Sequence, residues 1–274
     1  MTRPPVRLIA RLDIKGPNVI KGIHLEGLRI VGKPKSLAQR YYDQGIDEII
    51  YMDVVASLYG RNNIFDEVKD AASDIFVPLT VGGGLRSLDD ITTALRSGAD
   101  KVAINTAAVR NPQFIRQASE AFGSQCIVLS IEAKSRGAGK WEVLTDNGRE
   151  QTGRDVIEWV QEAESLGAGE ILVTSVDMEG TKKGFDHALT QAVRSCVQVP
   201  VIACGGAGSK DHVKNLVQGD QVDAVCCASL FHYEIETPVS LKKWLADQDI
   251  PVREPPDMAH GQDVGAGASG EGRP

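Results

Sequence analysis

The stretch VPLTVGGGL, from Val77 to Leu85, is a short apolar run that breaks into three consecutive glycines. A similar stretch, VPVIACGGAG, returns from Val199 to Gly208. Runs of Val, Ile and Leu favour buried strands, and glycines allow tight turns and close approach of the backbone to a ligand. The separation of the two stretches is a little under half the chain, which predicts a protein built from two similar halves that binds two similar groups.

Short apolar runs recur along the whole chain, each followed by a segment with helical periodicity. They alternate little between apolar and polar residues, which is typical of strands buried on both faces of a parallel sheet. One of the helical segments, SLDDITTALRSGAD, offers Ser87 as an N-cap. Strand then helix, eight times, predicts an α/β fold, a single (β/α)8 TIM barrel. The runs are RLIARLD (7–13), EIIYMDV (48–54), VPLTV (77–81), KVAIN (101–105), CIVLSIE (126–132), EILVTS (170–175), VPVIA (199–203) and DAVCCA (223–228).

Internal similarity favours the closed barrel over its rival, a doubly wound open sheet. ARLDIK, with Asp13, resembles LSIEAK, with Glu132. VGGGLRS matches CGGAGSK, and AINTAA matches CCASLF. Two equal halves of four strand–helix units close into one barrel, whereas an open sheet predicts no such symmetry.

Composition excludes several function classes. The chain has 274 residues, 42% hydrophobic and 24% charged, which is ordinary for a globular protein. A net charge of -7 argues against nucleic-acid binding, and no apolar run approaches the roughly 20 residues of a membrane span. We recognise no secretory signal. Five cysteines without C-x-x-C spacing predict reduced thiols in a cytoplasmic protein.

The domain organisation is predicted to be simple. Residues 1–253 carry the barrel pattern. Residues 254–274 are rich in Gly, Pro and small polar residues and lack an apolar period, so we expect a disordered C-terminal tail.

Residues at the carboxyl ends of the strands are the candidates for chemistry, because barrel active sites lie there. Two glycine-rich loops fall at such ends, and their backbone N–H groups could hold phosphate oxygens. The alternative is that these glycines only serve tight turns. Two symmetry-related loops predict an elongated substrate with a phosphate at each end. The first cup contains Gly82–Gly84, Asn105 and Thr106; the second contains Gly205–Gly208, Ala228 and Ser229, with Gly180 nearby.

Two carboxylates, Asp13 and Glu132, end opposite strands between these cups. Facing carboxylates suit general acid and general base roles. Asp53 and Asp177 also end strands, with a solvated strand end as the alternative interpretation. Lys21 lies in a long first connection, a candidate lid, and could reach a phosphate or an oxyanion, or be a surface lysine.

Charged residues also begin four strands at the opposite face. A ring of ion pairs there would ordinarily cap the barrel floor. The four residues are Arg7, Glu48, Lys101 and Glu170.

The combined motifs resemble the cyclase subunit of imidazole glycerol phosphate synthase over roughly Val6 to Arg253. They include LDIK…VIKG, LTVGGGLRSLDD, GADKVAINTAAVRNP, GAGEILVTSVDMEGTKKGFD, PVIACGGAG and ASLFHY. The resemblance implies a single barrel that takes the ribulosyl phosphoribosyl formimino carboxamide intermediate of histidine synthesis. It implies ring closure with ammonia, giving imidazole glycerol phosphate and aminoimidazole carboxamide ribotide. It also implies a glutaminase partner on the N-terminal barrel face, ammonia passage through the barrel, and no metal or organic cofactor.

The resemblance assigns roles residue by residue. Asp13 and Glu132 correspond to the catalytic pair, and Lys21 to the loop lysine. Arg7, Glu48, Lys101 and Glu170 correspond to a charged ammonia gate. The substrate- and phosphate-binding set is Lys21, Gly83, Gly84, Asn105, Thr106, Asp177, Gly180, Gly206 and Ser229.

Several positions depart from the family pattern. Glu132 and Glu179 stand where aspartate is usual, and Arg11 replaces a smaller residue, usually cysteine. Ile30 and Lys33 stand where acidic residues are common. An altered catalytic pair with a retained gate leaves a second hypothesis, a paralogue that channels ammonia for amidation of a surface-polysaccharide sugar.

Overall fold

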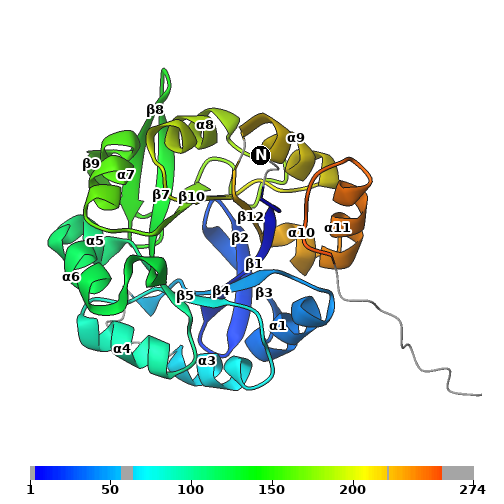
Figure 1. The fold of residues 1–274 in the computed structure, drawn as a ribbon, viewed down its shortest axis with the longest axis horizontal. Helices are drawn as coiled ribbons and strands as arrows, with labels where there is room; N and C mark the ends of the chain where they lie inside the picture. Colours follow the sequence, from blue (N-terminus) through cyan, green and yellow to red (C-terminus); the bar gives the residue numbers. More distant parts are fainter. Residues whose placement is uncertain (1–3, 57–63, 221, 255–274) are drawn as a thin grey trace, which may run out of the picture.

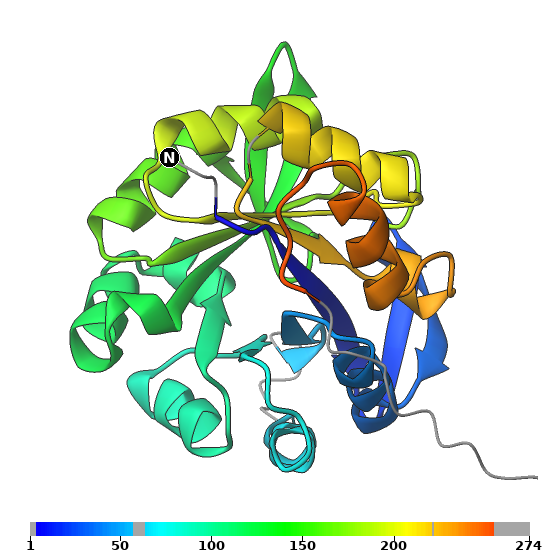
Figure 2. The same ribbon diagram turned by 45° about the vertical axis from the view of Figure 1, so that its right-hand side comes forward.

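The computed structural model describes residues 4–56, 64–220 and 222–254. Within them, eight parallel strands close into a barrel, because β12 pairs back with β1. Helices form an outer ring around the strands (Figures 1 and 2). The predicted (β/α)8 fold is therefore confirmed. The barrel strands are β1 (Arg7–Lys15), β4 (Glu48–Asp53), β5 (Leu79–Gly82), β6 (Lys101–Ile104), β7 (Ile127–Gly137), β10 (Glu170–Ser175), β11 (Val201–Cys204) and β12 (Ala224–Cys227).

The helices follow the strands as the periodicity predicts. Ser87 caps α4 in a capping box with Asp90, as expected from the sequence. The helices are α1 (Pro34–Asp43), α3 (Phe65–Ala72), α4 (Leu88–Arg96), α5 (Thr106–Arg110), α6 (Gln113–Phe122), η1 (Ser124–Cys126), α7 (Val156–Ser165), α8 (His187–Cys196), α9 (Lys210–Asp220), α10 (Ser229–His232) and α11 (Pro238–Ala246).

Two strands of the barrel continue into antiparallel excursions. The connection after β1 was expected to be a long loop, but it is the hairpin β2 (Asn18–Ile23) and β3 (Glu26–Gly32), paired to β1. A second excursion, β8 (Lys140–Thr145) and β9 (Glu150–Asp155), extends β7 and was not predicted. In Figure 1 the β7–β8 hairpin (green) projects beyond the ring of helices. Both excursions follow the first strand of a half.

The two halves repeat each other in backbone detail. Pro78 and Pro200 precede β5 and β11, and both strands begin only after the proline, which lacks an N–H group. The carbonyl of Pro78 accepts from Ile49 at 3.0 Å, and that of Pro200 accepts from Ile171 at 3.0 Å. The predicted internal symmetry is therefore present in the hydrogen bonding.

The apolar core has two layers, because alternate strand residues point into the barrel and out towards the helices. The outer layer includes Leu8, Leu12 and Trp159, all fully buried. The inner layer fills the barrel with residues such as Ile9 and Leu172. Polar residues therefore gather at the two ends of the barrel.

The first and last described segments lie side by side on the N-terminal side of the barrel, where Val6 forms a parallel bridge with Val252. Of the predicted tail, residues 254–274, all but Glu254 lie outside the described residues. None of the described helices combines the length and the apolar character that a membrane crossing needs.

Candidate active site

The two predicted catalytic carboxylates are buried near the carboxyl ends of β1 and β7. Asp13 is 5% exposed and Glu132 is 8% exposed. Each lies two residues after another inward-facing residue, Arg11 on β1 and Ser130 on β7, because side chains alternate along a strand. The barrel thus brings the pair to one end, as the sequence predicts.

Asp13 is surrounded by cations. Its Oδ1 accepts a hydrogen bond from Arg11 Nε at 2.7 Å, and Lys21 Nζ lies 3.4 Å from its Oδ2. Burial alone would raise the pKa of Asp13, but the charges of Arg11 and Lys21 outweigh it and hold the pKa below its usual value. Asp13 is therefore a fixed, ionised carboxylate.

Glu132 lies in a different environment. Its Oε2 accepts hydrogen bonds from Asn105 Nδ2 at 3.1 Å and from the backbone N–H of Gly148 at 2.9 Å. Burial raises the pKa of Glu132 to about 7, and the charge of Arg11 and the Gly148 N–H offset this only in part. Among the described residues no cation forms an ion pair with Glu132, in contrast to Asp13. Glu132 can thus carry a proton near neutral pH.

The first cup is an open cavity of about 320 Å³ next to Glu132. Gly83 has φ of +94°, and a Cβ there would collide with the backbone oxygen of Asp53. Only glycine fits this close approach. The predicted residues of this cup do come together, since the lining includes Gly83, Gly84, Asn105, Thr106 and Glu132.

The second cup is nearly filled. Its cavity measures about 10 Å³, which is room for about one water molecule. A larger hollow of about 630 Å³ adjoins it, and Lys21, Gly180 and Ser229 line both cavities. The predicted residues Gly180, Gly206 and Ser229 line the small cavity.

The two cups share their local backbone geometry. Gly206 has φ of +103°, and a Cβ there would collide with the carbonyl oxygen of Gly184, which parallels Gly83. Asn105 (φ -132°, ψ -87°) and Ala228 (φ -123°, ψ -73°) hold the same uncommon conformation just before α5 and α10. Tight turns alone do not require the two halves to share these backbone angles. The agreement therefore favours two sites for similar groups.

Lys21 connects the β2–β3 hairpin to the site. It is 3% exposed and its ammonium contacts both Asp13 and Glu179. The hairpin is also held by a hydrogen bond from the His24 backbone N–H to the Glu179 carbonyl at 2.9 Å. Lys21 is therefore a buried residue of the site and not a surface lysine.

Within the described residues, Asp177 and Asp53 form no hydrogen bond with the two candidate catalytic carboxylates. Asp177 pairs with Lys134 and accepts a hydrogen bond from the Ser135 N–H at 2.8 Å. It lines neither cavity described above, so its binding role stays a prediction. Asp53 lines the first cup, and its side chain accepts from the backbone N–H of Val55 at 3.0 Å.

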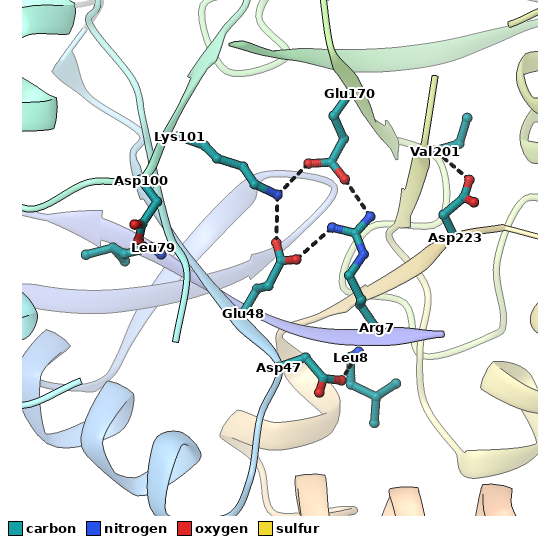
Figure 3. A network of polar contacts seen from close by, with 10 residues as sticks. All are labelled: Arg7, Leu8, Asp47, Glu48, Leu79, Asp100, Lys101, Glu170, Val201 and Asp223. Carbon is teal, nitrogen blue, oxygen red and sulfur yellow. Dashed lines mark hydrogen bonds and ion pairs between the residues drawn. The ribbon is translucent and has the colours of Figure 1, made fainter. Parts of the chain in front are cut away.

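The opposite end of the barrel carries a closed ring of ion pairs (Figure 3). Arg7 contacts Glu48 at 2.7 Å and Glu170 at 2.5 Å. Lys101 contacts the other oxygen of Glu48 at 3.1 Å and that of Glu170 at 2.9 Å. Each carboxylate thus bridges both cations. The four predicted gate residues do come together, at the N-terminal end of the barrel.

Aspartates that directly precede three strands form a feature that sequence reasoning missed. Asp47, Asp100 and Asp223 accept the backbone N–H groups of Leu8, Leu79 and Val201 at 2.7, 2.8 and 2.9 Å, respectively (Figure 3). Their recurrence just before alternate strands is visible in the sequence and could have been used. At the corresponding position before β10 stands Gly169, where a Cβ would collide with the carbonyl of Ser124.

Metal-ligating side chains do not cluster in the described ranges. Neither cup nor ring contains a set of three or more His, Cys, Asp or Glu residues arranged to hold a metal ion, and none is found elsewhere in residues 4–56, 64–220 and 222–254.

Comparison with known proteins places the chain in a family. The model of the family described as "Histidine biosynthesis protein" matches residues 7–237. A protein of Legionella pneumophila named imidazole glycerol phosphate synthase subunit HisF is 64% identical over 203 residues, covering 74% of this chain and 96% of the relative. The chain belongs to this histidine biosynthesis family.

Proposed function

We propose that this member of the histidine biosynthesis family is the cyclase subunit of imidazole glycerol phosphate synthase. It uses ammonia to convert the ribulosyl phosphoribosyl formimino carboxamide intermediate to imidazole glycerol phosphate and aminoimidazole carboxamide ribotide. The observation that carries the proposal is the unequal pair of carboxylates between two cups of matching geometry. Family membership and the similarity to the Legionella subunit support it.

The carboxylate environments assign acid and base. Asp13 is paired with cations and held ionised, so it serves as the general base. Glu132 has a pKa of about 7 and serves as the general acid. An acid and a base held in different protonation states at one pH are what coupled proton transfers in ring closure require.

The cups hold the two phosphates of the substrate. The open first cup takes one phosphate on the backbone around Gly83 and Gly84, next to Glu132. The second takes the other near Gly206 and Ser229. Lys21 on the β2–β3 hairpin lines both this cup and the adjoining larger hollow, so its ammonium can neutralise the phosphate.

The partner is a glutaminase that docks on the N-terminal face of the barrel. Ammonia released there enters through the ring of Arg7, Glu48, Lys101 and Glu170. The complex is cytoplasmic, in keeping with five cysteines that form no disulfide. Residues 1–253 form the catalytic domain.

The decisive experiment is cyclisation of the bisphosphate intermediate by the purified chain with free ammonia, which needs no partner. Turnover supports the proposal, and binding without turnover would restrict it to the phosphate cups. Sugar amidation is not favoured by a relative named for imidazole glycerol phosphate synthase. A chain that neither binds nor turns over the intermediate would reopen that possibility.

A further inference from the structure

Arg11 places a buried guanidinium inside the barrel. It lies between the inner apolar layer and the mouth, by which we mean the end of the barrel formed by the carboxyl ends of the strands. The residue is 2% exposed and lies on β1. Its Nε donates to Asp13 Oδ1 at 2.7 Å, and its Nη1 donates to Thr174 Oγ1 on β10 at 3.1 Å. The guanidinium thus connects the carboxylate to the opposite half of the barrel.

The equivalent position in the other half carries no charge. Ser130 precedes Glu132 by two residues, as Arg11 precedes Asp13, and it is also buried. Glu132 receives its hydrogen bonds from Asn105 and Gly148, neither of which is charged. Arg11 is thus the residue that breaks the equivalence of the two strands.

We propose that Arg11 is a positioning residue for the cyclisation reaction: it fixes the Asp13 carboxylate as the base and leaves Glu132 as the acid. The inference rests on the proposed function, since it assigns roles within that reaction. The guanidinium acts through Asp13, with one anchor on Thr174 and one on the carboxylate. A planar fork with two anchors restricts a carboxylate more than a single flexible ammonium does.

The other charged groups around Asp13 cannot replace Arg11. Lys21, on β2, lies farther from Asp13, at 3.4 Å, and is also held by Glu179. His232, on α10, is buried, which lowers its pKa to about 4, so it is neutral at working pH. The remaining titratable groups that face Arg11 and Asp13 are Glu132 on β7, Cys204 on β11 and Cys226 on β12.

The test uses R11M and R11K in the full chain with free ammonia. R11M removes the charge while filling the space, and we expect kcat to fall about 10²-fold, as for a displaced catalytic group, with little change in KM. Arg11 lowers the pKa of both Asp13 and Glu132, so both limbs of the pH profile should move to higher pH. R11K keeps the charge and should recover part of kcat and of the profile.

K242M is the matched control. Lys242 is also 2% exposed and also pairs with an aspartate, Asp47, at 2.7 Å, but on the helix α11. Its loss should lower the melting temperature as R11M does, without moving the pH profile. If R11M does not fold, T174V removes one anchor of the guanidinium and should lower kcat in the same direction.

A carboxyl titration of the free protein, by NMR with 13C-labelled aspartate, separates the two proposals. A raised Asp13 pKa in R11M supports the inference whether or not the wild-type chain turns over. A wild-type chain that neither binds nor turns over the intermediate would instead overturn the proposed function. An unchanged Asp13 titration, or an R11M that turns over as fast as or faster than the wild type, overturns the role of Arg11.

Discussion

The two ends of the barrel use similar charged groups to opposite effect. At the N-terminal end two cations and two carboxylates form a closed ring in which each carboxylate oxygen has a partner. At the mouth, Arg11 and Lys21 serve Asp13, while Glu132 is left with neutral donors. The difference shows that a buried carboxyl without an ion-pair partner can exchange a proton, since burial raises the pKa of Glu132 to about 7.

The largest expected effect comes from the charged carboxylate of the mouth. D13N keeps the shape but removes the base, so ammonia-dependent turnover should fall about 10³-fold, within the range of general base catalysis. Substrate binding, measured by calorimetry, should persist because the cups are untouched. Retained turnover would show that Asp13 is not the base, and that the ion-paired carboxylate of the mouth takes no part in proton transfer, like those of the ring.

The pH dependence sharpens the role of the other carboxyl. Glu132 must be protonated to act as an acid, and its pKa is about 7, so kcat/KM should be lost above that pH. The loss should approach about tenfold per pH unit, as for a single titrating acid. Asp13 has a pKa below its usual value, so it is already ionised across the alkaline limb. E132Q should remove the alkaline limb and lower the rate; an unchanged limb in E132Q would assign it to another group.

Substitution of Gly206 tests whether the second cup holds a phosphate against its closely packed backbone. G206A places a Cβ against the carbonyl of Gly184, and we expect KM to rise at least about tenfold, since one charge-assisted hydrogen bond contributes about 1.5–3 kcal/mol. G219A is the matched control, because a Cβ at Gly219 on α9 meets nothing within 4 Å. Equal KM values for the two variants would argue against a phosphate in the second cup.

The smallest effect on the chemistry is expected at the ring. E48Q leaves Arg7 and Lys101 with Glu170 as their remaining carboxylate, yet the mouth is unchanged. Turnover with free ammonia should therefore be kept, while turnover with glutamine and a glutaminase falls severalfold. D74N, which breaks the exposed Lys35–Asp74 pair, is the control. An equal loss with both ammonia sources would make the ring a structural cap.

Sequence reasoning reached the barrel, the carboxylate pair and the four ring residues, because each depends on where a strand begins or ends. It missed contacts between side chains of distant strands, such as Arg11 with Thr174. The spacing of residues along one strand does not show which residues of other strands lie opposite them. The excursion after β7 had a usable signal in Asp146, Asn147 and Gly148, all with positive φ and typical of a tight hairpin. That turn supplies a hydrogen bond to Glu132, so missing it concealed the environment of the acid.

The aspartates that precede alternate strands have a consequence for rebuilding this protein from duplicated parts. A barrel assembled from two copies of the first half would put an aspartate in place of Gly169. The present η1 turn does not allow this, because even a Cβ at Gly169 collides with the carbonyl of Ser124. It would also duplicate Arg11, giving both carboxyls a cation and leaving neither as a proton donor. Such a symmetric ancestor or design needs a different turn in place of η1. It would have two cups for phosphate groups, but it would lack the proton donor that ring closure needs.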